Sequence, residues 1–334
     1  MEAQRLNRIP RVGLDERVRD LPPLVGRPPA SGMSPTMAWI LLVALAGLLL
    51  LPFSSPSREL YALRDLAHIP LGMVVMVALA RLFRGAGSVG GLFLAFAVST
   101  LLVFALEAVQ PVVGGVGSIR NAVTGACGAL GAAILLAGRG QAPLLVLLTR
   151  LTALLFLALG ARSAVLDLVD AVKQREALPR LATFDDELEL RRWSFCGAKG
   201  TRVRRPSAGD DWWLRVDLQP GLRPAAVLEW PGGDWRSWSA LAFDIHVDGA
   251  GGLPIVLELR DHEDTGCEAG RCRERLVLEA GIHRIELPLS ILASAPSSRR
   301  LDLEHIRRVA WIAEGNLQLR TIHIDNVRLI RTPQ

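Results

Sequence analysis

Residues 104–131, FALEAVQPVVGGVGSIRNAVTGACGALG, decide the fold of the first half, because polar side chains here interrupt two long apolar runs. A glutamate near the end of a membrane helix is costly unless it faces protein or water, so Glu107 indicates a function. Gln110 shares a helix face with Glu107, and Pro111 marks the end of that helix. A glycine-rich turn then leads into a second helix, in which small residues permit close packing: Gly125, Gly128 and Gly131.

Long apolar segments surround this stretch. Five approach the roughly 20 residues that a membrane helix needs, near residues 37–53, 66–84, 89–110, 119–137 and 142–161. The chain has 334 residues, of which 50% are hydrophobic, and its second half has the composition of a soluble domain, so two domains are predicted. The net charge of +5 comes from arginine-rich tails and loops without a nucleic-acid motif, so no nucleic-acid partner is expected.

The N-terminal residues predict the orientation of these segments. Residues 1–37 are rich in arginine and proline without an apolar period, which predicts a disordered tail and no cleavable signal peptide. The tail and the loops on its side carry more arginines than the opposite loops, so the N-terminus is predicted to be cytoplasmic. With five spans, the chain after residue 162 is extracytoplasmic, which predicts a multi-pass protein of the inner membrane with a periplasmic C-terminal domain.

The motif Glu107-x-x-Gln110, the Gly-Ser turn, the glycine-rich helix and an upstream Asp65-x-x-His68 resemble the VanZ-like family of membrane proteins over roughly residues 38–140. Three polar positions of the family correspond here to Gly115, Asn121 and Gly125, so the match is partial. The resemblance implies a transmembrane bundle of four helices, with the segment near 142–161 as a fifth. It implies no reaction, because the biochemical activity of the family is not established.

The alternation of the helices predicts a polar pocket. Segments two, three and four bring six polar groups to one membrane face, where the downstream domain also emerges: Asp65, His68, Glu107, Gln110, Arg120 and Asn121. We expect His68 and Glu107 to pair, because ionisable groups inside membranes are usually paired. Arg120 is expected either to join them or to lie at the interface, satisfied by water, and the same alternatives hold for Asn121. His68 with Glu107 has the chemistry of an acid/base pair.

Residues 162–180 form a predicted amphipathic linker helix, because one helical face collects four apolar residues: Val165, Leu168, Val169 and Val172. Three placements are consistent with this pattern. The helix extends the fifth segment, lies on the membrane surface or packs on the next domain.

From about Leu181 the apolar residues alternate, which predicts an all-β antiparallel sandwich. Strands are expected at 212–218, 240–247, 254–261, 273–279, 282–289 and 320–329. The segments FDD at 184–186, DWRSWSALAF at 234–243 and IDNV at 324–327 resemble jelly-roll carbohydrate-binding modules of the galactose-binding-like type over roughly 181–331. The predicted fold class is therefore an α-helical membrane bundle of four or five helices followed by a jelly-roll sandwich, which also serves elsewhere as a protein-binding module.

Tryptophans are the candidate ligand-binding residues of this domain. Their faces stack on sugar rings, and core packing is the alternative for each of them. Trp212 and Trp213 are adjacent and face opposite sides of a strand, so one of the two is expected to be exposed. The module resemblance further implies a structural calcium ion at Asp185 and Asp325, with a solvated acidic turn as the alternative.

Cys267 and Cys272 flank four residues in a loop between strands. In an oxidising compartment they are expected to form a disulfide, whereas zinc binding would need more ligands than the nearby His262.

Three hypotheses of function follow. The first is a non-enzymatic membrane protein that presents a domain for glycan or an envelope partner, in cell-envelope or exopolysaccharide processes. The second is an intramembrane enzyme or transporter acting on a lipid-linked glycan through His68, Glu107 and Gln110. The third is a membrane scaffold whose sandwich binds protein only. Expected partners are membrane lipid and glycan or polysaccharide, and no cofactor beyond calcium is expected.

Overall fold

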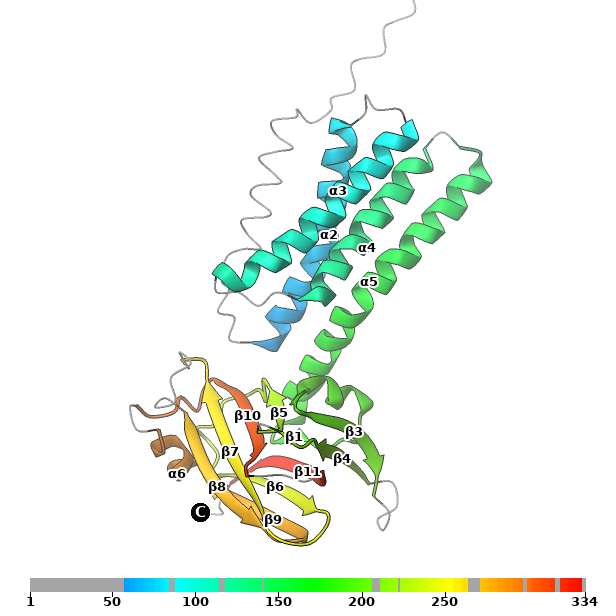
Figure 1. Cartoon of the computed structure of the whole chain (residues 1–334). Coiled ribbons are helices and arrows are strands. Elements are labelled where there is room, and N and C mark those ends of the chain that lie inside the picture. The colour runs from blue at the N-terminus through cyan, green and yellow to red at the C-terminus, as the bar shows by residue number, and fades with distance from the viewer. Residues whose placement is uncertain are drawn as a thin grey trace, which may run out of the picture.

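The computed structural model describes residues 57–83, 88–113, 118–139, 141–205, 211–221, 223–263, 271–296, 299–315 and 319–331. The predicted tail at 1–37 and the predicted segment at 37–53 lie outside these residues. A bundle of long helices stands on a β-sandwich, and the last helix runs on into the sandwich (Figure 1). The helices are α2 (Arg58–Leu82), α3 (Ser88–Val109), α4 (Ile119–Ala137) and α5 (Pro143–Ala177). Within the described residues, these four are long and apolar enough to cross a membrane.

Local sequence explains where the helices begin and end. Ser57 caps α2 by accepting a hydrogen bond from the Leu60 backbone N–H. Pro111 cannot continue α3, which gives way to the short 3₁₀ helix η2 (Gln110–Val113). Pro143 begins α5 at a position where its missing N–H costs nothing.

Glycines set the spacing between α2 and α4. A Cβ atom at Gly72 would lie 1.9 Å from the carbonyl oxygen of Gly125, and one at Gly128 would lie 2.2 Å from that of Ile69. Neither position can carry a side chain without moving a backbone. The glycine-rich sequence of α4 therefore lets this helix pack directly against α2, as small residues do in membrane helix pairs.

The sandwich consists of two antiparallel sheets that enclose one apolar core. In the first sheet the order is β3 (Ala198–Arg204), β4 (Trp212–Leu218), β11 (Arg320–Ile330), β6 (Ala240–Val247) and β9 (Gly281–Pro288), and β1 (Arg180–Ala182) pairs with the far end of β11. In the second sheet the order is β2 (Trp193–Cys196), β5 (Ala225–Glu229), β10 (Ile306–Ala313), β7 (Leu253–Asp261) and β8 (Cys272–Leu278). Short helices η3 (Glu187–Arg192) and α6 (Leu289–Ser294) complete the domain.

The predicted antiparallel sandwich is confirmed, and all six predicted strands lie within one residue of their expected bounds. The sequence analysis did not predict β5, and its burial explains why. Four successive residues of β5 are buried, because Ala225 and Val227 pack in a small apolar cluster on the outer side of the second sheet. A strand covered on both faces has no alternating pattern.

The linker at 162–180 is not a separate helix, because α5 continues without a break from Pro143 to Ala177. Of the three placements considered, it extends the fifth segment and its end packs on the sandwich. The apolar face lies outward, with Val165, Val169 and Val172 exposed. The face turned toward the protein carries Asp167, Asp170 and Gln174, all buried.

Candidate functional site

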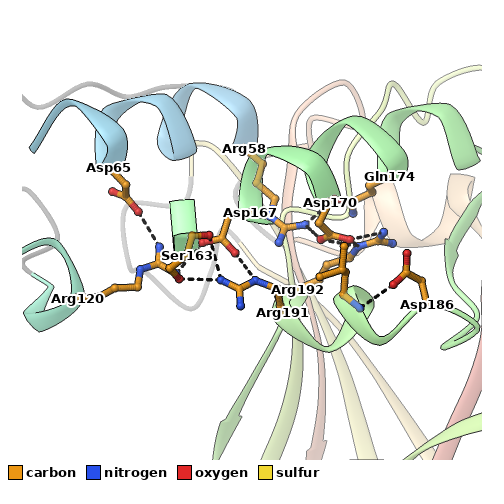
Figure 2. A network of polar contacts seen from close by, with 11 residues as sticks. Arg58, Asp65, Arg120, Ser163, Asp167, Asp170, Gln174, Asp186, Arg191 and Arg192 are labelled. Carbon is orange, nitrogen blue, oxygen red and sulfur yellow. Dashed lines mark hydrogen bonds and ion pairs between the residues drawn. The ribbon is translucent and has the colours of Figure 1, made fainter. Parts of the chain in front are cut away.

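The junction between bundle and sandwich is built around two aspartates of α5. Figure 2 shows them between arginines from both sides. Asp170 is fully buried and accepts hydrogen bonds from Arg192 of η3, at 2.8 Å from Nη2, and from Arg58 at the start of α2. Arg192 also donates to the carbonyl oxygen of Leu181 at 2.9 Å. One carboxylate thus ties α2, α5 and the entry of the sandwich together.

Asp167 makes a similar connection one turn earlier in α5. Its carboxylate accepts from Arg120 of α4 at 2.6 Å and from Arg191 of η3 at 2.7 Å. Arg120 reaches on to Asp65 of α2, also at 2.6 Å. Arg120 therefore does not join His68 and Glu107; its side chain is 47% exposed and lies in a separate network of ion pairs that crosses three helices (Figure 2).

Aromatic and amide contacts close the junction. Tyr61 of α2 packs against Trp230 of the sandwich, with ring centroids 5.0 Å apart. Gln174 of α5 donates to the carbonyl oxygen of Trp230 at 2.9 Å. A cavity of about 220 Å³ remains between these groups and the arginines. Because charged, amide and aromatic contacts all cross the same boundary, the sandwich is held in one orientation on the helix ends.

A second polar cluster lies inside the bundle at the same end. His68 is fully buried in α2, and its Nε2 lies 2.7 Å from Oε1 of Glu107 in α3, an ion pair by distance although not aligned as a hydrogen bond. Gln110 donates to Glu107 at 3.0 Å and accepts from Arg64 at 2.9 Å. The backbone N–H of Ser118, at the start of α4, donates to the other oxygen of Glu107 at 2.7 Å. The structure therefore brings His68, Glu107 and Gln110 together.

The backbone partners of Nδ1 fix the orientation of the His68 ring. Nδ1 of His68 lies 3.1 Å and 3.3 Å from the carbonyl oxygens of Arg64 and Asp65. Carbonyl oxygens only accept, so Nδ1 carries a hydrogen. Nε2 is thereby directed at Glu107, 2.7 Å away. Asn121 is buried nearby in α4, and its Oδ1 has no hydrogen-bond partner among the described residues.

The adjacent tryptophans face opposite sides of β4. Trp212 packs against the core, with the guanidinium of Arg202 3.7 Å from its ring. Trp213 lies on the outer face of the first sheet and is 5% exposed, because Arg205 covers its ring at 4.6 Å. Neither is the freely exposed platform that the sequence predicted.

Trp213 nevertheless lines a groove of about 490 Å³ on the outer face of the first sheet. The groove lining combines aromatic and aliphatic side chains with imidazole, guanidinium and carboxylate groups: Val203, Arg204, Arg205, Trp213, Arg215, His246, Asp248, Ile282 and His323. Its volume falls within the range of small-molecule sites. Arg215 is ion-paired with Asp217 at 2.9 Å, and Arg205 with Asp211 at 3.2 Å.

The two carboxylates assigned to calcium differ in their surroundings. Asp325 is buried and its Oδ1 has no hydrogen-bond partner among the described residues. Burial, and then the nearby carboxylates of Asp211 and Asp244, raise the pKa of Asp325 to about 7, against a backbone hydrogen bond at Asn326 that lowers it. This orphaned oxygen fits a cation.

Asp185 fits a cation less well. Its side chain is exposed, and its carbonyl oxygen accepts from Nη2 of Arg202 at 2.8 Å. Arg202 also binds the neighbouring carbonyl of Phe184 at 2.5 Å, so a guanidinium already supplies positive charge at this turn.

The disulfide of Cys267 with Cys272 stays a prediction, because Cys267 lies outside the described residues. Cys272 begins β8 and is fully buried in the sandwich core. Burial raises the pKa of the Cys272 thiol to about 12.

Comparisons with known proteins find solved structures that are similar to part of the chain. No family model and no curated protein matches, so the VanZ-like resemblance rests on the motif residues. Solved structures that match include an exo-beta-agarase at 17% identity and TM-score 0.38. That match covers 46% of this chain and 26% of the agarase. The family 11 carbohydrate-binding module of a Clostridium thermocellum cellulosomal cellulase matches at 21% identity and TM-score 0.34, covering 46% of this chain and 94% of the module. A family 30 carbohydrate-binding module from Clostridium thermocellum matches at 12% identity and TM-score 0.33, covering 43% of this chain and 88% of the module.

Asp65 and Arg120 were candidates from the sequence, but the junction residues of α5 and the histidines of the groove were not. Asp167, Asp170 and Gln174 recur every three or four positions in the sequence LDLVDAVKQ, which is a buried polar face of a helix. His246 and His323 alternate with core residues in their strands. Both patterns are visible in the sequence. A polar stripe is ordinarily the solvent-exposed side of an element, and only the contacts in the structure show that these residues face other parts of the protein.

Proposed function

We propose that this chain is an integral membrane protein that holds a carbohydrate-binding sandwich against the extracytoplasmic ends of its helices. The observation that carries the proposal is the junction, in which buried Asp170 joins α2, α5 and η3. A binding domain on a flexible linker needs no such contacts. A domain fixed at the ends of four apolar helices presents its groove at a defined height above the membrane.

The groove beside Trp213 is the proposed glycan site. Oligosaccharides bind through apolar ring faces and many hydroxyl groups, so their sites combine aromatic surface with side chains that donate and accept hydrogen bonds. Exposed Ile282 supplies apolar surface above the buried ring of Trp213, while Arg215, His246 and Asp248 supply the polar partners. The membrane part is proposed to belong to the VanZ-like type, and a role in cell-envelope or polysaccharide processes is part of the same proposal.

Arg215→Ala is expected to weaken glycan binding by about 10- to 150-fold, because hydrogen bonds to charged groups contribute roughly 1.5–3 kcal/mol. The measurement is a glycan array with the purified full-length chain, followed by titration of the best saccharide. Arg236→Ala is the matched control, since Arg236 is also paired with an aspartate two residues away but lies outside the groove lining. An array without any bound glycan, together with capture of an envelope protein, would favour the scaffold hypothesis instead.

The same topology carries two further proposals. An extracytoplasmic sandwich puts Cys267 and Cys272 in an oxidising compartment, where their disulfide would close the loop before β8. A calcium ion would be held by Asp325, with Asp185 contributing only if its turn reorganises around Arg202.

A second candidate function is proton-dependent chemistry or transport on a lipid-linked glycan inside the bundle. The specific observation is the close contact of His68 with Glu107 within apolar helices, where an ionisable residue usually has a function. Glu107→Gln keeps the shape of the side chain and removes its ability to exchange a proton. A variant that keeps its expression and glycan binding but loses its role in the cell would favour this candidate, and an unaltered cellular role would exclude it.

A further inference from the structure

Two sets of histidine and aspartate gather on the sandwich, although the whole sequence has only 6 histidines. The first set is His246, Asp248 and His323, and the second is His262, Asp302 and His305. In each set, one ligand atom per residue lies within 4.8 Å of the others. The proposal concerns the first set, which lies in the groove beside Trp213.

Strand register brings the first set together. His246 of β6 and His323 of β11 are direct partners across the first sheet, so their side chains lie next to each other on its outer face. Their rings stack at 5.6 Å and 21°. Asp248 follows β6 and is fixed by a backbone hydrogen bond from its N–H to the carbonyl oxygen of Thr321 at 3.0 Å. Both histidines are therefore positioned by the sheet and the aspartate by its edge.

The distances suit an ion between the three groups. Nδ1 of His246 lies 3.5 Å from one oxygen of Asp248, and Nδ1 of His323 lies 3.8 Å from the other. Hydrogen bonds from nitrogen to oxygen are shorter than this. Ligands at 2.0–2.2 Å from a tetrahedral zinc ion are about 3.4 Å from each other. Nδ1 of His323 is also buried and has no hydrogen-bond partner among the described residues.

The second set differs in this respect. Nδ1 of His305 lies 2.8 Å from Asp302, an ordinary hydrogen bond, and His262 is exposed. The carboxylate of Asp302 additionally accepts from the backbone N–H of Glu304 at 2.9 Å. Nδ1 of His262 lies 3.4 Å from the same oxygen of Asp302, but that carboxylate is already held by His305 and by the backbone of Glu304, so the second set serves as an internal control.

The neighbouring arginines do not exclude a cation. Arg215 is paired with Asp217, and Arg205 is paired with Asp211, so two of the guanidinium charges that line the groove are compensated. Trp213 contacts both imidazole rings with its edge or face, at 5.9 Å from His246 and 5.6 Å from His323. It orients the two ligands and shields one side of the site, while the groove leaves the other side open.

We propose that His246, Asp248 and His323 bind a divalent transition-metal ion of the zinc class, with at least one coordination position open to the groove. Two imidazoles and one carboxylate form a common protein ligand set for such ions, whereas calcium prefers oxygen ligands alone. The open position accepts water or an oxygen of a bound ligand.

The test uses the purified full-length chain with a tag free of histidine, stripped with EDTA. Titration with zinc chloride in a calorimeter should give one ion per chain, and cobalt(II) should give the visible absorption of a tetrahedral site. His246→Ala and His323→Ala should each weaken binding by more than about 100-fold, since loss of an outer-shell partner alone costs 10–100-fold. The double variant His262→Ala/His305→Ala should bind as the parent does.

Position is read independently from fluorescence. Cobalt(II) should quench part of the tryptophan emission of the parent, and this part should be missing in Trp213→Phe while the stoichiometry stays at one. Melting curves without metal show whether each variant is folded, and a conservative His323→Gln replaces any variant that is not. The proposal is overturned if the parent binds no zinc below millimolar concentration, or if binding survives His246→Ala but is lost in the His262→Ala/His305→Ala control.

Discussion

Asp170→Ala is expected to lower the free energy of unfolding by about 3–5 kcal/mol, the cost of removing one partner from a buried ion pair. The parent carboxylate is fully buried and ion-paired with both Arg58 and Arg192, which are 12% and 4% exposed. Alanine would leave two guanidinium groups facing each other without a counter-charge, with only neutral acceptors on Gln174 and Leu181. Because these arginines belong to the bundle and to the sandwich, we expect the two parts to separate before either unfolds.

The measurement is thermal melting of the full-length chain, combined with limited proteolysis of the 177–180 connection. Lys173→Ala is the control, since Lys173 lies one turn further along α5 and pairs with Asp186 at the surface, where ion pairs contribute little. Replacing Asp170, Arg58 and Arg192 together by leucine or methionine should restore much of the loss, because a buried apolar cluster needs no counter-charge. A melting temperature of Asp170→Ala equal to that of the control would contradict this account of the junction.

The sequence predicts parts of the fold that depend on local pattern. Alternation along single strands gave the bounds of β4, β6 and β9, since each has one face in the core and one outside. Glu107 could be singled out because a charge in an apolar run has few explanations. Its contact with His68 needed only the alternation of helix directions and the depth of each residue.

The junction could not be predicted in the same way. Asp170 lies in a helix whose opposite face is apolar. Apolar periodicity alone indicates that the apolar face contacts the protein, whereas the structure buries the face of Asp170. Its partners Arg58 and Arg192 are 112 and 22 residues away, and Arg192 sits on a 3₁₀ helix of six residues. Pairings over such distances depend on the orientation of whole domains. The groove histidines were missed for a related reason, because strand register between β6 and β11 brings them together.

Asp325→Asn is expected to stabilise the sandwich at pH 8 in the presence of EDTA. Asp325 is buried and lies directly opposite Asp244 in the pairing of β11 with β6, an arrangement of like charges that is destabilising. With a folded-state pKa of about 7 against about 3.9 in the unfolded chain, the folded state binds the proton more tightly. The resulting stability is fully present below pH 4 and is lost as the pH rises through 7, by up to about 4 kcal/mol.

The control is a carboxylate whose pKa is shifted in the opposite direction, and Asp217 on the adjacent strand is such a group. Against the effect of its burial, hydrogen bonds from Arg215 and Thr321 hold the pKa of Asp217 below its usual range. Asp217→Asn should therefore destabilise the protein at pH 8, whereas Asp325→Asn should raise the melting temperature and flatten its dependence between pH 5 and 8. A lower melting temperature for Asp325→Asn in EDTA would show that the carboxylate has a partner that the structure does not contain. Calcium added at pH 8 separates the remaining alternatives, since an ion bound by Asp325 stabilises the parent and leaves the asparagine variant unchanged.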